Sequence, residues 1–531
     1  MSTEVKKEGG MIRFARAVER VGNKLPHPMY IFLYLLIAVM IISAICSVAG
    51  VSVTYMAAAK DGTVAETTVA VKNLLSRGEL QNFLANIISA YQSNTMLIPM
   101  LVCAMCMAVA EETGFFEAAL RKLLLGAPRG VATYALCVVG VCSNICSDAG
   151  MILAPAIGAV LFKALGRNPW IGISVGYGAS AAGFTANLLP ATTDALLSGI
   201  SAQLAIDAGT ALGKNYVVHA MSNYIFLFAA TWVVALGLTF VCEKFVAPVY
   251  GDKKAGSGDD AGLKKFALTD AENKGLKHAM IGLLIFVVVL VLGCLPVANF
   301  PFLIGFFRSV GGKIVGITAA PIMKGIVPLI GIFFLCIGIP YGYGSGKIKK
   351  KGDIPKMIQK GVIKMSGLVF IVFPCSLFIY EFNRCGLSTV ISIGGERLLR
   401  AIGLTGFPML VVYILVIAVI NIFMYSGSAK WMILAPIFIP MFANMGIHPA
   451  LTQLAYRIGD SSTNNLTPLN ACLLAVIALM EQYRDPEINS EEPGMGTVLS
   501  TQLPISIATL VCMIGLLGVF YFFNLPIGIG V

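Results

Sequence analysis

The sequence Met151-Ile-Leu-Ala-Pro155 occurs a second time as Met432-Ile-Leu-Ala-Pro436. Asn187-Leu-Leu-Pro190 follows the first copy, and Asn465-Leu-Thr-Pro468 follows the second at nearly the same distance. One match of this length could arise by chance in an apolar chain, but two matches in the same order indicate an internal repeat. The chain is therefore expected to consist of two related halves.

The composition identifies the kind of protein in which this repeat lies. The chain has 531 residues, of which 57% are hydrophobic and 12% charged, and its mean hydropathy is +0.84. Soluble proteins have about 25% charged residues, so this composition excludes a cytosolic enzyme, a disordered chain and a nucleic-acid-binding domain. An integral membrane protein with many helical spans remains, and its net charge of +11 fits basic cytoplasmic loops.

Apolar stretches of about 20 residues predict the membrane spans. Seven stretches are long and mostly apolar: 29–49, 91–110, 216–242, 279–307, 325–343, 365–380 and 500–522. Two weaker stretches, 168–193 and 452–480, contain polar residues and proline. The sequence therefore predicts about nine transmembrane helices.

Basic loops give the orientation, because short cytoplasmic loops carry an excess of Lys and Arg. The N-terminal segment and the loops 243–278 and 345–364 are rich in these residues and are predicted to be cytoplasmic. The loop 382–405 is placed outside, although it contains three arginines. Segment 251–278 is expected to be a cytoplasmic linker between a first half, 1–250, and a second half, 279–531.

The segments around the two copies of the repeat are unusual as spans. Segment 131–162 is interrupted by the polar tip 143–148, and segment 407–447 by the Ser-rich tip 426–428. Each is predicted to be a re-entrant hairpin, which a membrane tolerates where it lies against protein or a watery cavity. The loop assignments place the hairpins on opposite sides. The expected fold is an all-α polytopic membrane protein: an inverted-repeat transporter with about nine transmembrane helices and two re-entrant hairpins.

The two Asn-x-x-Pro copies are expected to interrupt helices, since proline removes a backbone donor and frees a carbonyl. Freed carbonyls and carboxylates bind cations, whereas exposed helix N-termini bind anions. Asn187 and Pro468 lie in these breaks, and Asn187 is a candidate substrate contact.

Two charged residues lie in the second weak span. Arg457 and Asp460 are three residues apart and so share a helix face. One interpretation is a structural ion pair between them. The other is that Asp460, with Ser461 and Asn465, binds a hard cation through oxygen atoms, and that Arg457 binds a substrate carboxylate.

Three further residues have two interpretations each. Asp194 follows the first break and is either a helix cap or part of a site. Trp431 follows the second tip and is either an interfacial anchor or a stacking surface for an aromatic or cationic ligand. Asn421, on the apolar arm before that tip, either binds an ion or joins two helices.

Signatures of soluble enzymes are missing from the sequence. It has no Walker A loop, His-Glu-x-x-His motif or Rossmann fingerprint, and no convincing nucleophile–base pair for an intramembrane hydrolase. The chain is therefore expected to be neither an enzyme nor an ATP-driven pump, and to need no cofactor. A membrane channel is the alternative outside the transporters, and the two hairpins argue against it.

Several long motifs resemble the AbgT family of bacterial p-aminobenzoyl-glutamate transporters, almost from end to end. They are Arg20-Val-Gly-Asn-Lys-Leu-Pro-His-Pro28, Gly183-Phe-Thr-Ala-Asn-Leu-Leu189, Thr192-Thr-Asp-Ala-Leu-Leu-Ser-Gly-Ile-Ser201, Lys324-Gly-Ile-Val-Pro-Leu-Ile330, Ser426-Gly-Ser-Ala-Lys-Trp-Met-Ile-Leu-Ala-Pro436, Tyr456-Arg-Ile-Gly-Asp-Ser-Ser462 and Leu525-Pro-Ile-Gly-Ile-Gly530. Members import p-aminobenzoyl-glutamate, a folate breakdown product, or export sulfonamide antimetabolites. The resemblance therefore implies an ion-coupled secondary transporter of one of these two kinds.

The resemblance also implies a homodimer in the bacterial inner membrane and assigns site residues. The substrate-binding positions fall on Asp194, Ser428, Trp431, Arg457, Asp460 and Pro468, and Asn421 falls in a sodium site with Asp460. Sodium or a proton is the expected coupling ion. Lys430 stands where some members have an uncharged residue, and a basic group there is expected to alter the choice of substrate. The expected partners are a small-molecule cargo, the lipid bilayer and a second copy of the chain, but no nucleic acid.

Overall fold

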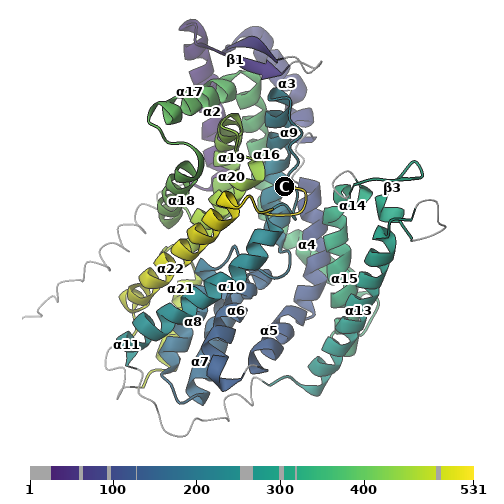
Figure 1. Ribbon diagram of the computed structural model, residues 1–531, viewed down its shortest axis with the longest axis vertical. Coiled ribbons are helices and arrows are strands. Elements are labelled where there is room, and N and C mark those ends of the chain that lie inside the picture. The colour runs from purple at the N-terminus through teal and green to yellow at the C-terminus, as the bar shows by residue number, and fades with distance from the viewer. Residues whose placement is uncertain are drawn as a thin grey trace, which may run out of the picture.

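The computed structural model describes residues 26–58, 64–92, 97–126, 128–251, 267–297, 304–316, 320–485 and 492–531. These residues form mainly α-helices, as the composition predicts (Figure 1). The predicted cytoplasmic N-terminal segment and most of the predicted linker 251–278 lie outside the described residues.

Eight helical stretches in the described part of the chain are long and apolar enough to cross a membrane. Seven correspond to the seven strong predictions: α2 (Pro28–Val48), α4 (Leu97–Glu112) preceded by α3 (Arg77–Gln92), α10 (Tyr224–Val241), α13 (Asp270–Cys294), α15 (Ile326–Gly344), α16 (Asp353–Arg384) and α22 (Met495–Phe522). The eighth, α18 (Gly406–Phe423), is the first arm of the second predicted hairpin. The chain is thus a multi-pass membrane protein.

The first predicted hairpin is a helix–turn–helix unit. α6 (Ala132–Cys142) leads into a short 3-10 segment, η2 (Ser143–Ala149), and α7 (Gly150–Ala164) follows it. A Cβ atom on Gly150 would lie 2.0 Å from the carbonyl oxygen of Ser143. The tip is therefore too tight for any residue but glycine.

The second predicted hairpin consists of α18 and α19 (Gly427–Asn444). Ser426 caps α19, because its hydroxyl accepts a hydrogen bond from the backbone N–H of Ala429 at 3.4 Å. A Cβ atom on Gly427 would lie 2.6 Å from Oδ2 of Asp460. Glycine at this position therefore lets the tip approach a carboxylate.

Both weak spans are broken helices, as the Asn-x-x-Pro copies predict. In the first half the break 183–191 separates α8 (Pro169–Ala182) from α9 (Thr192–Ala211). In the second half the break 463–471 separates α20 (Pro449–Ser462) from α21 (Cys472–Gln482). Both breaks are largely buried, so their free backbone groups face the protein interior.

The tips of the two hairpins meet inside the molecule. Figure 1 shows α6 and α7 in the lower half of the molecule and α18 and α19 in the upper half. At the junction the thioether sulfur of Met151 lies 3.7 Å from the hydroxyl of Tyr425 and 3.6 Å from Nδ2 of Asn470. The two related units thus approach each other from opposite ends of the molecule.

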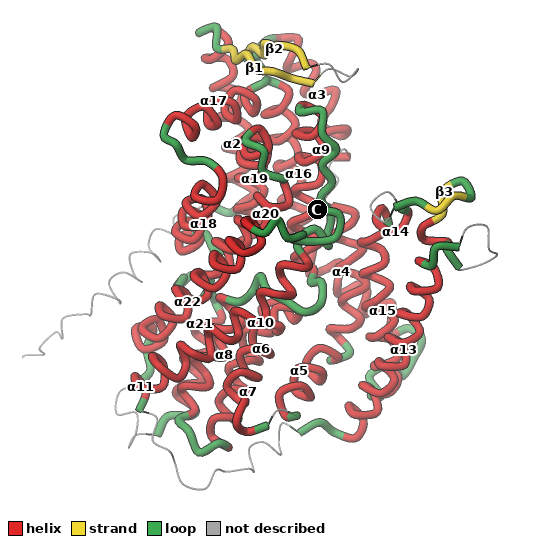
Figure 2. The backbone as a smooth tube through the Cα atoms, in the orientation of Figure 1, coloured by secondary structure: helices red, strands yellow, loops and turns green. Residues whose placement is uncertain are grey.

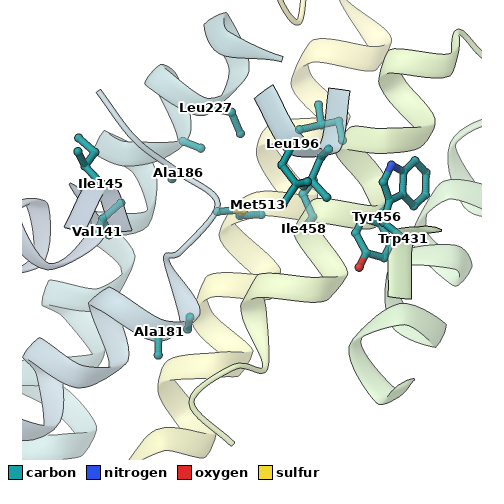
Figure 3. Packing of buried hydrophobic residues seen from close by; sticks show 14 of the residues in the cluster. Val141, Ile145, Ala181, Ala186, Leu196, Leu227, Trp431, Tyr456, Ile458 and Met513 are labelled. Atoms are coloured by element: carbon teal, nitrogen blue, oxygen red, sulfur yellow. The ribbon is translucent and has the colours of Figure 1, made fainter. Parts of the chain in front are cut away.

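Small residues let α7 pack very closely against α8. A Cβ atom on Gly158 would lie 2.2 Å from the carbonyl oxygen of Gly172, and one on Gly172 would lie 2.1 Å from that of Gly158. Such contacts are typical of helix pairs in membranes. Larger apolar side chains fill the interior around the broken helices, among them Trp431, Tyr456 and Met513 (Figure 3).

The all-helical expectation omits two short pairs of antiparallel strands (Figure 2). β1 (Ser52–Ala58) pairs with β2 (Val64–Ala70), and β3 (Ser309–Val310) pairs with β4 (Lys313–Ile314). β1 and β2 are rich in Val and Thr, which favour strands. Long apolar stretches do not indicate these strands, because both strands are too short and too polar to cross a membrane.

The arginines of the loop 382–405 have partners within the structure. Arg384 forms ion pairs with Glu79 and Glu381, and Arg400 forms one with Glu396 at 2.9 Å. Nη2 of Arg397 donates to the carbonyl oxygen of Thr54 at 2.6 Å. Most of this loop forms the amphipathic helix α17. Helix α17 spans Leu387–Ala401. The other short elements are α5 (Phe115–Leu125), η1 (Arg129–Val131), η3 (Cys242–Val246), α11 (Ala247–Tyr250), η4 (Phe306–Arg308) and α14 (Pro321–Lys324).

Candidate functional site

A cavity of about 300 Å³ lies where the second hairpin tip meets the two breaks. This volume is at the lower end of the range for small-molecule sites. Its wall consists of Met151, Phe184, Thr185, Thr193, Leu196, Leu197, Tyr425, Ser426, Gly427, Ser428, Arg457, Asp460 and Asn464. Three of the predicted site residues, Ser428, Arg457 and Asp460, therefore line it.

Three helices begin at this cavity. Met151, Thr193 and Ser428 line it, and each belongs to the first turn of its helix: α7, α9 and α19. The first turn of a helix carries unpaired N–H groups and a partial positive charge. Three such ends at one cavity favour an anionic ligand.

A buried ion pair adds charge to the cavity wall. Nη1 of Arg457 lies 2.6 Å from Oδ1 of Asp194, and both side chains are only 2% exposed. Oδ2 of Asp194 accepts a hydrogen bond from the backbone N–H of Ala191 at 2.6 Å, at the start of α9. Asp194 is thus a helix cap and also the counter-ion of Arg457.

This arrangement leaves polar atoms without hydrogen bonds. Among the described residues, Nε of Arg457, Oδ1 of Asp194 and Oδ1 of Asn187 are buried and have no hydrogen-bond partner. The contact between Arg457 and Asp194 is therefore a charge contact without the alignment of a hydrogen bond. An unsatisfied buried polar atom costs about 1–3 kcal/mol. Of these three atoms, only Nε of Arg457 belongs to a residue of the cavity wall, and it is a donor whose bonding a ligand there can complete.

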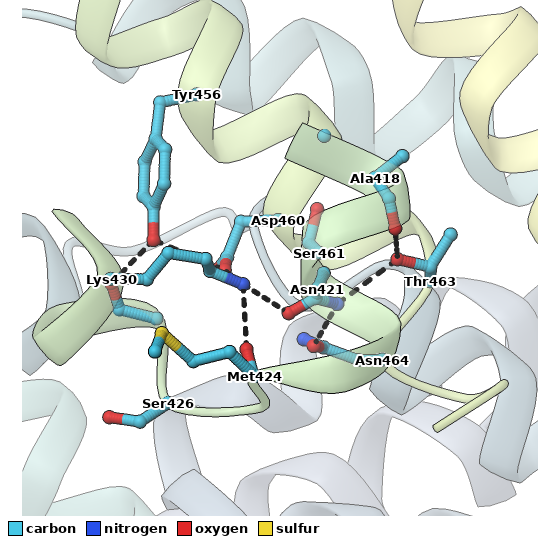
Figure 4. A network of polar contacts seen from close by, with 12 residues as sticks. Ala418, Asn421, Met424, Ser426, Lys430, Tyr456, Asp460, Ser461, Thr463 and Asn464 are labelled. Atoms are coloured by element: carbon cyan, nitrogen blue, oxygen red, sulfur yellow. Dashed lines mark hydrogen bonds and ion pairs between the residues drawn. The ribbon is translucent and has the colours of Figure 1, made fainter. Parts of the chain in front are cut away.

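The second charge on α20 has a different partner. Oδ1 of Asp460 lies 2.7 Å from Nζ of Lys430, whose side chain is 1% exposed. The hydroxyl of Tyr456 lies 3.2 Å from the same oxygen and also donates to the carbonyl oxygen of Gly427 (Figure 4). The direct ion pair that their spacing suggests for Arg457 and Asp460 is not formed, since each is paired with a residue of another helix.

Asn421 joins this second cluster. Its Nδ2 donates to Oγ1 of Thr463 at 3.1 Å and to Oδ1 of Asn464 at 2.9 Å, and its Oδ1 accepts from Nζ of Lys430 at 2.5 Å (Figure 4). These contacts agree with the interpretation that Asn421 joins two elements, whereas ion binding by Asn421 stays a prediction. It connects α18 to the break after α20, and its oxygen faces a cation.

Trp431 lies inside the protein and is fully buried. Its ring stacks on that of Tyr456, with the ring centroids 4.5 Å apart and the planes at 28° (Figure 3). Its Nε1 donates to Oγ of Ser201 at 3.0 Å. The interpretation as an interfacial anchor is wrong, because the ring has no exposed surface. Trp431 is not among the residues of the cavity wall, so direct stacking of a ligand on this ring stays a prediction.

Three predicted site residues point away from the Asp460 cluster. The hydroxyl of Ser461 donates to the carbonyl oxygen of Arg457 in its own helix at 2.9 Å. The amide of Asn465 contacts Gln502 and Ser506 on α22. Pro468 is half-buried in the second break and is not part of the cavity wall.

The position of Lys430 near the start of α19 is a sequence signal that this lysine has a partner. A lysine in the first turn of a helix is unfavourable, since that end of the helix is already positive. Its position therefore indicates a nearby negative partner. The identity of that partner depends on how α19 packs against α20, which the sequence does not specify.

Long apolar helices surround a cavity that is formed by two hairpin tips and two broken helices, and this arrangement defines a membrane transporter. The profile of the AbgT putative transporter family matches residues 13–531. The chain belongs to this family.

Three known proteins are similar over almost the whole chain. The p-aminobenzoyl-glutamate transport protein of Escherichia coli (strain K12) is 34% identical over 514 residues, 97% of this chain and 96% of that protein. The YdaH transporter of Alcanivorax borkumensis has a TM-score of 0.82 at 27% identity, over 95% of this chain and all of that one. MtrF of Neisseria gonorrhoeae, described as illuminating a class of antimetabolite efflux pumps, has a TM-score of 0.86 at 30% identity, over 98% of this chain and all of that one.

Proposed function

We propose that this transporter moves p-aminobenzoyl-glutamate, or a related aromatic carboxylate, across the bacterial inner membrane by ion-coupled secondary transport. The observation that carries the proposal is the meeting of three helix N-termini and the buried guanidinium of Arg457 at one cavity. The cargo named for the relative of 34% identity supports the choice of substrate.

The chemistry of this cargo matches the cavity. A carboxylate can accept hydrogen bonds from the free Nε of Arg457 and from the first-turn N–H groups of α19. The aminobenzoyl ring can pack against the apolar side chains of Leu196, Leu197 and Phe184.

Uptake by proteoliposomes tests the proposal. Purified protein is reconstituted, a sodium or proton gradient is imposed, and entry of labelled p-aminobenzoyl-glutamate is followed. Saturable uptake that depends on a gradient is expected, with competition by unlabelled cargo and weaker competition by glutamate, which lacks the ring. Non-saturable flux that is independent of any gradient would contradict the proposal, and conduction at channel rates would favour a channel.

Export of sulfonamide-type antimetabolites is the second candidate. The description of MtrF, which superimposes at a TM-score of 0.86, favours it. Expression in a drug-sensitised bacterium distinguishes the two. Raised sulfonamide tolerance would support export, whereas unchanged tolerance together with cargo uptake would support import.

We further propose the arrangement in which this transport occurs. The basic loops place the N-terminus in the cytoplasm, and the family resemblance favours a homodimer and a carrier that leaves its cargo chemically unchanged. A gradient of sodium or protons would drive the cycle. Cross-linking in native membranes checks the dimer, because a monomer would yield no linked pair.

A further inference from the structure

The ammonium group of Lys430 lies in a nest of oxygen atoms. Its Nζ is 2.7 Å from Oδ1 of Asp460, 2.5 Å from Oδ1 of Asn421 and 3.0 Å from the carbonyl oxygen of Met424 (Figure 4). These three ligands come from α20, from α18 and from the residue that ends α18. The side chain is 1% exposed, so the contacts replace hydration almost completely.

The same oxygen atoms would suit a small metal cation. A carboxylate, an amide oxygen and a main-chain carbonyl are the ligands that hard cations such as Na⁺ prefer. The carbonyl of Met424 is at the C-terminal end of a helix, where the helix dipole is negative. Interrupted helices in transporters place such ends at ion sites.

The orientation of Asn421 shows that the nest is built for a cation. Its Nδ2 is engaged with Thr463 and Asn464, so its oxygen must point at Lys430. Thr463 is held in turn, because its hydroxyl donates to the carbonyl oxygen of Ala418 at 2.9 Å. The amide therefore presents an acceptor to this position whatever positive group is there.

With Lys430 in place, these residues do not fit a sodium ion. A Na⁺ ion bound by Asp460 and Asn421 would lie within contact distance of the ammonium, and two like charges at that separation repel strongly in a buried site. The lysine also takes up acceptors that the metal would need.

We propose that the ammonium of Lys430 takes the place of a bound sodium ion, so that Lys430 is the residue that makes this transporter independent of Na⁺ at the Asp460–Asn421 site. The proposal rests on the proposed function, since it concerns which gradient drives transport. The alternative is that Lys430 serves only to neutralise Asp460. In that case removal of the lysine side chain would create no sodium site.

Sodium binding to purified full-length protein in detergent tests the proposal without any organic cargo. Thermal unfolding and ²²Na⁺ binding are measured while Na⁺ replaces choline at constant ionic strength. Wild type is expected to show no saturable response. Lys430→Ala is expected to gain one, because the three oxygen ligands remain and the competing charge is gone. Adding Asp460→Asn to Lys430→Ala should abolish the gain.

Lys360→Ala is the matched control, since Lys360 also forms an ion pair, at 2.6 Å with Glu112, but its side chain is 59% exposed. This variant should bind sodium no better than wild type. A saturable sodium response in wild type would overturn the proposal, and so would its absence in folded Lys430→Ala.

Transport by wild type gives a second measurement if Lys430→Ala does not fold. Cargo uptake should be unchanged when external Na⁺ is replaced by choline, and a loss of more than about tenfold would overturn the proposal. Failure of the proposed function looks different, because uptake would then be absent in both media while the sodium-binding results stay as expected.

Discussion

Arg457 and Asp460 are neighbours on one face of α20, yet each is neutralised by a residue from another helix. Asp194 at the start of α9 pairs with Arg457, and Lys430 in the first turn of α19 pairs with Asp460. Buried pairs of this kind contribute little net stability but are costly to break. Substitutions in these two ion pairs can therefore separate the contribution of each residue to stability from its contribution to binding.

Replacing Arg457 by Ala should lower stability and abolish saturable cargo binding. The carboxylate of Asp194 would be left buried without its counter-ion, which costs about 3–5 kcal/mol. Adding Asp194→Asn removes that buried charge, so the double variant should recover most of the stability but none of the binding. Thermal unfolding and binding of labelled p-aminobenzoyl-glutamate measure the two effects separately.

Arg167→Ala is the control for this experiment. Arg167 forms an ion pair with Glu243 at 2.8 Å and is not part of the cavity wall, so its loss should leave cargo binding intact. If the Arg457→Ala, Asp194→Asn double variant binds cargo as tightly as wild type does, Arg457 is only a structural residue.

The pair of Lys430 and Asp460 should behave as a coupled unit. Asp460→Asn removes the charge that faces a buried ammonium, and a hydrogen bond between charged groups contributes about 1.5–3 kcal/mol. The free energies of unfolding of wild type, Lys430→Met, Asp460→Asn and the double variant form a double-mutant cycle. We expect a coupling energy of about that size, and additive effects would show that the contact contributes nothing.

At the scale of elements, the packing of α7 on α8 depends on two glycines whose carbonyl oxygens lie where the partner's Cβ atom would be. Gly158→Ala and Gly172→Ala should each destabilise the protein by about 1–3 kcal/mol or more, since the helices must move apart. Gly367→Ala in α16 is the matched control, because its added Cβ meets nothing within 4 Å. Thermal unfolding of the three variants decides whether the close contact is required.

Helix-forming elements could be predicted well from the sequence, because hydrophobic length and proline breaks are local properties. All seven strong spans and both broken helices occur at the expected places. The strands β1 and β2 cannot be predicted from hydrophobic length, since their signal is alternation over a few residues. The partners of Arg457 and Asp460 were not predictable either, because they depend on contacts between distant helices.

At the scale of the whole molecule, helix α16 connects the lysine-rich segment 345–352 to the region beside the β1–β2 pair. α16 has 32 residues and is about 48 Å long at 1.5 Å per residue. It begins after the lysine-rich segment 345–352. At its other end Gly386 lies near Val69 and Ala70 of β2. If α16 crosses the membrane, the lysines and the β1–β2 pair lie on opposite sides.

A labelling experiment checks the proposed orientation. Single cysteines are placed at Lys350 and Thr67 in a background where the 13 native cysteines are replaced, and intact cells are treated with a membrane-impermeant maleimide. Thr67→Cys should react in intact cells, whereas Lys350→Cys should react only after the inner membrane is permeabilised. The reverse pattern would place the N-terminal and lysine-rich segments outside.

The resident ammonium of Lys430 has an electrical consequence. A positive group that is part of the chain cannot accompany its cargo to the other compartment, so an anion that crosses without another cation moves net negative charge. Each elementary charge that crosses 100 mV changes the free energy by about 2.3 kcal/mol, and a dianion by about twice as much. In a cell that is negative inside, the voltage would then expel the cargo, which favours export over uptake unless protons cross with it.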